Sequence, residues 1–204
     1  RRTHAMREPP YDLVLVNGSA EENQSRGTCA GTLIATDPEA GDVHTFTLAA
    51  GAGDADNNSF LIVGDQLRTV AVFDFESKST YSIRVQADDG SGGTYATALT
   101  VLVLNTNDAP AIVQGAGPLG VILSEDESPV AWSAPALGAT DDENSLLTWS
   151  LAALPSHGMA EVSGIGASPS VFVYAPAPDY GGSDSLAVQV SDGNGGVDTI
   201  VVNI

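Results

Sequence analysis

From Tyr11 onward, apolar and polar side chains alternate in short runs, a spacing of two that is typical of half-buried β-strands. The clearest run extends from Tyr81 to Ala87, where every second residue is apolar and each residue between is polar. Apolar residues follow the same spacing in three further runs, 99–103, 186–190 and 200–204. Glycine-rich turns separate the runs, and no stretch has a convincing helical period. The pattern therefore predicts an all-β fold of many short strands packed as sandwiches.

A repeated acidic pattern divides the chain into two similar halves. Asp37 and Asp141 each open a cluster of acids and lie 104 positions apart, while Asp89 and Asp192 each begin a glycine-rich turn and lie 103 apart. A period of about 100 residues is the length of one sandwich domain. We therefore predict a disordered lead-in at residues 1–10 and two β-sandwich domains at 11–108 and 109–204. The linker between them reads Asn105-Thr106-Asn107-Asp108-Ala109-Pro110.

Charge narrows the range of partners. The chain has 26 Asp and Glu against 7 Lys and Arg, a formal net charge of −19, and its last basic residue is Arg84. Such a surface repels phosphate backbones and attracts cations, so we predict no nucleic-acid partner. No apolar run reaches the roughly 18 residues of a membrane helix, and we predict no transmembrane segment in this chain. The single cysteine, Cys29, rules out an internal disulfide, and its apolar surroundings predict that it is buried.

Motifs for catalysis are missing from the sequence. It contains no G-x-S-x-G, no H-E-x-x-H, no P-loop and no pair of histidines at metal-ligand spacing. We therefore predict that the chain is not an enzyme. His44 is expected on a strand in a structural or solvated role. Trp132 and Trp149 are expected to pack in the core or between sheets rather than to form a platform for sugars.

Each half carries an ordered set of short motifs. The first half contains Glu22-Asn23, Asp74-Phe75-Glu76, Ala87-Asp88-Asp89 and the linker. The second half contains Leu147 to Leu151, Pro155 to Gly158, Tyr174 to Gly182 and Val190 to Gly196. Through these motifs the first half resembles a cadherin repeat, and the second resembles the cadherin-like tandem repeats of bacteria. Together the matches cover almost all of Tyr11 to Ile204. The resemblance implies two tandem Greek-key β-sandwich domains of the cadherin and immunoglobulin kind.

Calcium lies between consecutive repeats in that family and stiffens the joint, so the resemblance implies Ca²⁺ as a cofactor. Calcium is a hard cation that takes roughly six to eight oxygen ligands from carboxylates, amides and backbone carbonyls. Carried over residue by residue, the implied ligands are Glu22, Asp74 and Glu76 from the first domain, Asn105, Thr106, Asn107, Asp108 and Ala109 from the linker, and Asp141, Glu143 and Asp192 from the second domain. Thr106 and Ala109 would act through their backbone carbonyls. Asn105 stands where the family has aspartate, which removes one charge from the bridging position.

The resemblance also assigns Asp37, Glu39 and Asp89 to a calcium site that is shared with a preceding repeat. The segment before them, Met6 to Pro10, has one basic and one acidic residue and lacks the linker motif. We therefore expect this end of the chain to bind calcium weakly or not at all.

These features predict a calcium-rigidified extracellular module of a larger cell-surface or secreted protein. Its expected role is cell adhesion, with calcium as ligand and a cell-surface protein or a polysaccharide as partner. Two alternatives stay open. One is a carbohydrate-binding accessory segment of a secreted polysaccharide-active enzyme, which a row of exposed aromatic side chains would favour. The other is a mechanical spacer with no partner surface.

Overall fold

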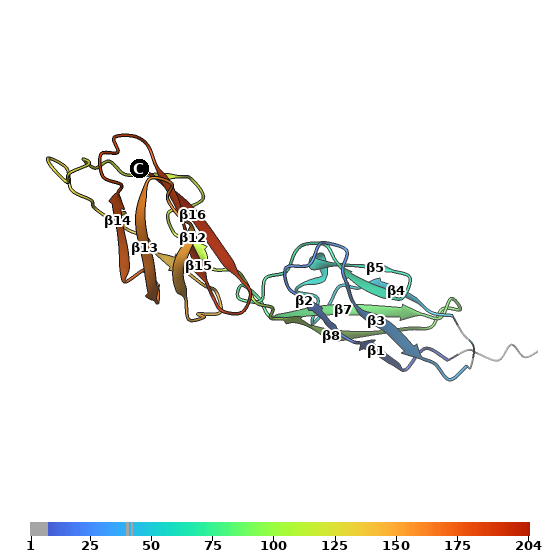
Figure 1. The fold of residues 1–204 in the computed structure, drawn as a ribbon. Coiled ribbons are helices and arrows are strands. Elements are labelled where there is room, and N and C mark those ends of the chain that lie inside the picture. The colour runs from blue at the N-terminus through green and yellow to red at the C-terminus, as the bar shows by residue number, and fades with distance from the viewer. Residues whose placement is uncertain (1–7, 40, 42) are drawn as a thin grey trace, which may run out of the picture. The chain divides into compact units, whose positions relative to one another are not determined.

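The computed structural model describes residues 8–204 apart from positions 40 and 42. The chain divides into two compact units, of which unit 1 ends at Thr106 and unit 2 extends from Asn107 to Ile204 (Figure 1). Residues 1–7 of the predicted lead-in lie outside the described residues, and Pro10 at its end is fully buried.

Unit 1 is a sandwich of two four-stranded sheets and one short 3₁₀ helix. One sheet has the order β1-β3-β6-β5 and the other has the order β2-β8-β7-β4. The elements are β1 (Asp12–Val16), β2 (Ser19–Glu21), β3 (Cys29–Thr36), β4 (Thr45–Leu48), η1 (Asn57–Ser59), β5 (Phe60–Val63), β6 (Gln66–Thr69), β7 (Thr80–Asp88) and β8 (Thr94–Leu104).

The core of unit 1 follows from the alternation in its strands. Ile83, Val85 and Ala87 of β7 have no solvent exposure, and each polar residue between them is only partly buried. Val101 and Val103 of β8 face the same core, which Leu13, Leu33, Phe60 and Leu67 close from the other sheet. The strands predicted from the spacing of two are confirmed, because each places its apolar residues on the inner face.

A parallel pairing brings the start of the chain to the end of unit 1. Strand β2 pairs with β8 in parallel, with Glu21 opposite Leu104. The backbone N–H of the next residue, Glu22, donates to the carbonyl of Leu104 at 3.1 Å. Glu22 therefore lies beside the first linker residues, although more than 80 positions separate them in the sequence.

The prediction that Cys29 is buried is wrong, because this cysteine is exposed. Strand β3 has a bulge between Cys29 and Gly31, where Cys29 pairs with Arg68 and Gly31 pairs with Leu67. The extra residue, Ala30, takes the inward position and has no solvent exposure. A bulge shifts the side-chain alternation by one residue, and Cys29 is left on the outer face.

Unit 2 has one six-stranded sheet, β10-β16-β15-β12-β13-β14, and one two-stranded sheet, β11-β9. Strands β13 and β14 lie next to each other at one edge of the larger sheet (Figure 1). The elements are β9 (Ala111–Ile112), β10 (Leu119–Gly120), β11 (Ala139–Thr140), β12 (Thr148–Ala153), β13 (Gly158–Ile165), β14 (Val171–Pro176), β15 (Ser185–Ser191) and β16 (Val197–Asn203).

Both tryptophans pack in unit 2, as predicted. Trp149 on β12 is almost fully buried, and its indole N–H donates to the carbonyl of Gly166 at 2.9 Å. Trp132 packs against the core from the irregular segment before β11 and meets the rings of Phe172 and Tyr174. Neither ring is presented to solvent as a flat platform. The tryptophans therefore stabilise the fold.

Candidate functional site

Glu22 is the most unusual of the predicted ligands, because it is a fully buried acid. Its Oε2 accepts a hydrogen bond from the backbone N–H of Phe75 at 2.7 Å, and its Oε1 accepts one from the backbone N–H of Thr106, also at 2.7 Å. Burial of a carboxylate is costly unless its oxygens are hydrogen-bonded, and here both oxygens accept backbone donors. Glu22 thereby joins the turn after β6 to the start of the linker.

Two other predicted ligands of unit 1 lie in the turn that Glu22 holds. Glu76 accepts a 2.7 Å hydrogen bond through Oε1 from the side-chain amide of Asn105. Both carboxylate oxygens of Asp74 instead accept from Ser77, one from its backbone N–H and one from its hydroxyl, each at 2.8 Å. The backbone N–H of Ser77 is the main reason that the pKa of Asp74 is lowered. Asp74 therefore has a clear role in closing this turn, in addition to its predicted role as a ligand.

In unit 2, the linker residue Asn107 is tied to the loop that follows β15. The side-chain amide of Asn107 donates to Oδ2 of Asp192 at 2.7 Å. Oδ1 of Asp192 accepts the backbone N–H groups of Asn194 at 2.7 Å and Gly196 at 3.0 Å. The hydrogen bond from Asn107 is the main cause that lowers the pKa of Asp192, and burial opposes it. The hydrogen bonds from Asn107 and from the loop thus favour the charged form of Asp192.

Only glycine fits at position 196. A β-carbon on Gly196 would collide with Oδ2 of Asp192 and lie 2.8 Å from Cα of Ala109. The loop therefore packs directly against the linker backbone at Ala109. The sequence places Gly196 within a turn motif, but a local motif does not reveal this packing role.

The acids between β11 and β12 complete the predicted set in unit 2. Oε2 of Glu143 accepts the backbone N–H of Asp108 at 3.1 Å, and Oδ1 of Asp141 accepts the backbone N–H of Ser145 at 2.7 Å. The second oxygen of each carboxylate, Oε1 of Glu143 and Oδ2 of Asp141, is buried and has no hydrogen-bond partner. A buried carboxylate oxygen without a partner carries a desolvation cost that a cation would relieve.

The donor set suits a hard cation. Every predicted side-chain ligand offers oxygen, as a carboxylate or an amide. No Lys or Arg follows Arg84, so unit 2 has no Lys or Arg that could neutralise Asp141, Glu143 or Asp192. Calcium takes such oxygens at variable geometry, and the buried oxygens of Asp141 and Glu143 that accept no hydrogen bond are suited to it. The residues present therefore fit calcium.

Exposed aromatic side chains are scarce. Among the residues that the structure describes, Tyr11 is the one aromatic residue with a largely exposed side chain. A row of aromatic rings along one sheet face, which would favour the carbohydrate alternative, is not formed by these residues. Within the same part of the chain, no helix is long and apolar enough to cross a membrane.

Several known proteins are similar to this chain in sequence or in fold. Residues 107–204 match the family model described as "Bacterial Ig domain". Human Protocadherin-16 is 33% identical over 104 residues, which is 48% of this chain, and the match spans 3% of that protein's length. The structure of human Protocadherin-24 EC1-2 superposes with a TM-score of 0.57 at 16% identity, over 94% of this chain and 96% of that one.

A second solved structure gives the same result. The Protocadherin gammaB7 EC3-6 cis-dimer structure has a TM-score of 0.55 at 19% identity, over 95% of this chain and 52% of that chain. Identities this low show the fold, which agrees with the architecture of both units. The chain is therefore a tandem of two cadherin-like β-sandwich domains, the second of which matches the bacterial Ig domain family.

Proposed function

We propose that the chain is a calcium-binding extracellular adhesion module, in which Ca²⁺ at residues 105–109 restricts the joint between its two domains. One observation carries the proposal. Two consecutive linker residues donate hydrogen bonds to acids of their own units. The backbone N–H of Thr106 donates to Glu22 in unit 1, and the side-chain amide of Asn107 donates to Asp192 in unit 2. A cation bound by these acids and the linker would therefore act on both units.

The linker donors are neutral, which explains why a cation would still be favoured. Backbone N–H groups and the side-chain amides of Asn105 and Asn107 satisfy single oxygens of Glu22, Glu76, Glu143 and Asp192. They do not cancel the negative charges. Bound calcium would supply two positive charges and a partner for the two buried oxygens that lack one, Oδ2 of Asp141 and Oε1 of Glu143. The chain would contribute Glu22, Glu76, Asp108, Asp141, Glu143 and Asp192 as carboxylate ligands, the amide oxygens of the two asparagines, and the linker carbonyls of Thr106 and Ala109. Asp74 belongs to the proposed set as well.

Thermal unfolding in excess chelator, in calcium and in magnesium tests calcium binding. Extracellular modules bind calcium at roughly 10⁻⁴–10⁻³ M, so the titration must reach about 10 mM. Calcium at ten times Kd should stabilise the folded chain by about 1.4 kcal/mol, whereas magnesium should do little. Replacing the acids with unpartnered oxygens, as Asp141→Asn with Glu143→Gln, should abolish most of the shift. Asp142→Asn, an exposed acid between them, is the matched control and should keep it.

Restriction of the joint and adhesion need separate readouts. Small-angle scattering should report a narrower spread of molecular dimensions in calcium than in chelator, and the double variant should remain broad in both. Beads coated with the chain should aggregate, or bind cells, only in calcium. Calcium binding without any capture would favour the spacer, and the absence of a calcium-specific shift would overturn the proposal as a whole.

A further inference from the structure

Two Asn-Gly pairs occur in the sequence, Asn17-Gly18 and Asn194-Gly195. An asparagine that is followed by glycine deamidates readily, because glycine has no side chain to hinder the attack of its own backbone nitrogen on the asparagine amide. The two pairs are chemically alike, and each lies within one unit. Their structural surroundings differ, and this difference decides which of them can react.

Asn17 lies where the chain crosses from one sheet of unit 1 to the other, between β1 and β2. It is exposed, and its φ of 54° lies in the left-handed region that asparagine tolerates. In the part of the chain that the structure describes, no hydrogen bond holds the side-chain amide of Asn17 or the backbone N–H of Gly18. The two groups that would react are therefore not tied to the rest of the fold.

A hydrogen bond beside this pair favours the reaction. The backbone N–H of Ser19 donates to the carbonyl of Asn17 at 2.7 Å. That carbonyl and the N–H of Gly18 belong to one peptide group, whose nitrogen must lose its proton to become the nucleophile. Deprotonation moves negative charge onto the carbonyl oxygen, and a donor that is already in place stabilises this charge. Ser19 therefore raises the fraction of the Gly18 nitrogen that is in its reactive, deprotonated form.

Asn194 has the same following residue but is held in its loop. Its backbone N–H donates to Oδ1 of Asp192 at 2.7 Å, and its side-chain amide donates to the hydroxyl of Ser145 at 3.4 Å. The backbone N–H of Gly195 also faces the carboxylate of Asp192, whose pKa it helps to lower after the larger effect of the Asn107 amide. The nitrogen that would attack is therefore bound to an acceptor.

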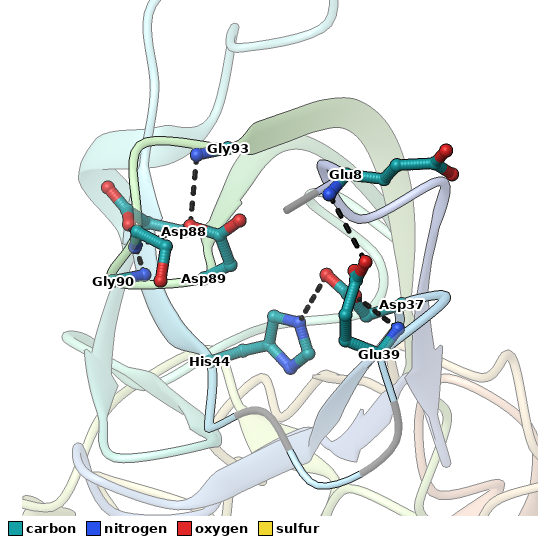
Figure 2. Close-up of polar contacts among 9 residues, drawn as sticks. Glu8, Asp37, Glu39, His44, Asp88, Asp89, Gly90 and Gly93 are labelled. Atoms are coloured by element: carbon teal, nitrogen blue, oxygen red, sulfur yellow. Dashed lines mark hydrogen bonds and ion pairs between the residues drawn. The ribbon is translucent and has the colours of Figure 1, made fainter. Parts of the chain in front are cut away.

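The equivalent loop of unit 1 has the same hydrogen bonds around its first acid. Oδ1 of Asp89 accepts the backbone N–H groups of Ser91 at 2.7 Å and Gly93 at 2.9 Å (Figure 2). Ser91 takes the place of Asn194 in this comparison. The acid therefore fixes the loop whether or not an asparagine follows, and Asn194 would have to break these bonds before it could react.

We propose that Asn17 is a site of spontaneous deamidation and isomerisation, and that Asn194 is protected by its loop. The nitrogen of Gly18 attacks Cγ of Asn17 and closes a succinimide ring, while Nδ2 leaves as ammonia and takes up the proton that the Gly18 nitrogen has lost. Water then opens the ring. Its attack at Cγ gives aspartate, whereas its attack at the main-chain carbonyl carbon gives isoaspartate, in which the peptide runs through the side chain. The inference does not depend on the calcium site proposed at the linker.

Isoaspartate would disturb the crossing between the sheets, because it adds one carbon atom to the main chain at a crowded point. The carbonyl of Gly18 accepts the backbone N–H of Leu102 on β8 at 3.0 Å. A β-carbon on Gly18 would lie 3.0 Å from the side chain of Leu15 and 3.3 Å from the carbonyl of Thr100. The added atom must therefore displace β2, the strand that leads to Glu22. We expect the modified chain to melt at a lower temperature.

Peptide mapping by mass spectrometry tests the site, with electron-transfer fragmentation to separate aspartate from isoaspartate. The full chain is kept in warm, mildly alkaline buffer with chelator. Asn17 should convert about tenfold faster than Asn194 or more, because the loop hydrogen bonds of Asn194 must open first. In urea the two sites should convert at nearly equal rates, because both are followed by glycine.

The variant Asn17→Gly provides the control for the effect on the fold. It removes the amide and suits the positive φ of this position, so it should fold and should melt unchanged after the same incubation. The parent chain should melt at a lower temperature once Asn17 has converted. Equal conversion of Asn17 and Asn194 in the folded chain, or survival of Asn17 there while it converts in urea, would overturn the site. A converted parent chain that melts unchanged would overturn the displacement of β2.

Discussion

The backbone N–H of Thr106 donates a 2.7 Å hydrogen bond to the buried carboxylate of Glu22, across 84 positions of sequence. The parallel pairing of β2 with β8 makes this contact possible, because it carries Glu22 past the carbonyl of Leu104. The same carboxylate also accepts the N–H of Phe75. One acid thus fixes the last residue of unit 1 and the turn after β6, before any metal is bound.

Replacing Glu22 with glutamine should destabilise unit 1 even without calcium. Glutamine offers one acceptor oxygen in place of two, so either Phe75 or Thr106 loses the partner of its backbone N–H. We expect a loss of about 1–3 kcal/mol in the free energy of unfolding, the usual cost of leaving a buried donor unsatisfied. Urea unfolding followed by circular dichroism in chelator measures the loss. Amide hydrogen exchange should locate it at positions 75 and 106.

The neighbouring acid provides the control for this change. Glu21→Gln removes the same charge from an exposed residue of β2, so it should alter stability by less than about 0.5 kcal/mol. Equal stability of the two variants would show that the buried hydrogen bonds of Glu22 contribute nothing beyond its charge.

Acid should weaken unit 2 through Asp184, which is 8% exposed. Burial raises the pKa of this carboxyl, but the backbone N–H groups of Ser156, His157 and Ser185 and the hydroxyl of Tyr174 outweigh burial, and the net shift is downward. A lowered folded pKa means that the stabilisation is complete above the unfolded value of about 3.9 and is lost as pH falls through the folded value. Asp184→Asn should remove this part of the acid dependence and cost about 1–3 kcal/mol at neutral pH.

Tryptophan fluorescence follows this effect selectively, because Trp132 and Trp149 both lie in unit 2. Urea midpoints for the parent chain should fall steeply as pH drops below the unfolded pKa of about 3.9, and those for Asp184→Asn should fall less. Parallel curves for the two proteins would contradict the assignment. Asp179→Asn, an exposed acid of the same unit, should leave the curve unchanged.

Tyr174 should resist alkaline titration. Burial, and then its hydrogen bond to the Asp184 carboxylate, raise the pKa of this phenol to about 12. A raised folded pKa stabilises the fold fully below the unfolded value of about 10, and the stabilisation is lost as pH rises through about 12. Ultraviolet titration of the phenols should therefore show a late step that is missing from Tyr174→Phe. A late step of unchanged size in that variant would assign it to another tyrosine.

The elements that follow simple alternation could be predicted from the sequence. The strand around Ile83 and Val85 and the packed Trp149 are such cases, because a period of two fixes which side chains face the core. Cys29 escaped prediction because a bulge shifts its strand by one residue. Bulges depend on how a strand meets its neighbour, and the neighbour is not visible in a local pattern.

In the candidate site too, some features could be predicted from the sequence and others could not. Resemblance named Glu22, Glu143 and Asp192, and each proves to accept a hydrogen bond from a linker residue of its own unit. Sequence could not show that Asp74 also closes a turn with Ser77, since one acid can serve either purpose. His44 was expected on a strand, but it lies one residue before β4. Where a strand begins depends on its pairing with a neighbour, here β7, which the local pattern does not reveal.

A single methyl group at position 196 should displace the loop that holds Asp192. The added β-carbon of Gly196→Ala would collide with Oδ2 of Asp192 and press on Cα of Ala109. We expect unit 2 to lose about 1–3 kcal/mol, as for overpacking elsewhere, and calcium affinity to fall with it. Gly181→Ala is the matched control, because a β-carbon there would have no neighbour within 4 Å. Identical urea midpoints of tryptophan fluorescence for the two variants would contradict this packing.

The substitution Asn105→Asp should destabilise the chain without calcium but strengthen its binding of calcium. The amide of Asn105 donates to Oε1 of Glu76 at 2.7 Å, so a carboxylate in its place would lose that bond and repel Glu76. In chelator the variant should therefore melt at a lower temperature than the parent chain. In calcium the added charge should strengthen ion binding by about tenfold, since one more charge at 4 Å contributes about 1 kcal/mol in water and more near a protein surface. Asn58→Asp places the same charge on an exposed residue of unit 1 and should do neither. If the variant melts at a lower temperature in chelator but binds calcium no more tightly, position 105 does not face the ion and its amide serves only to hold Glu76.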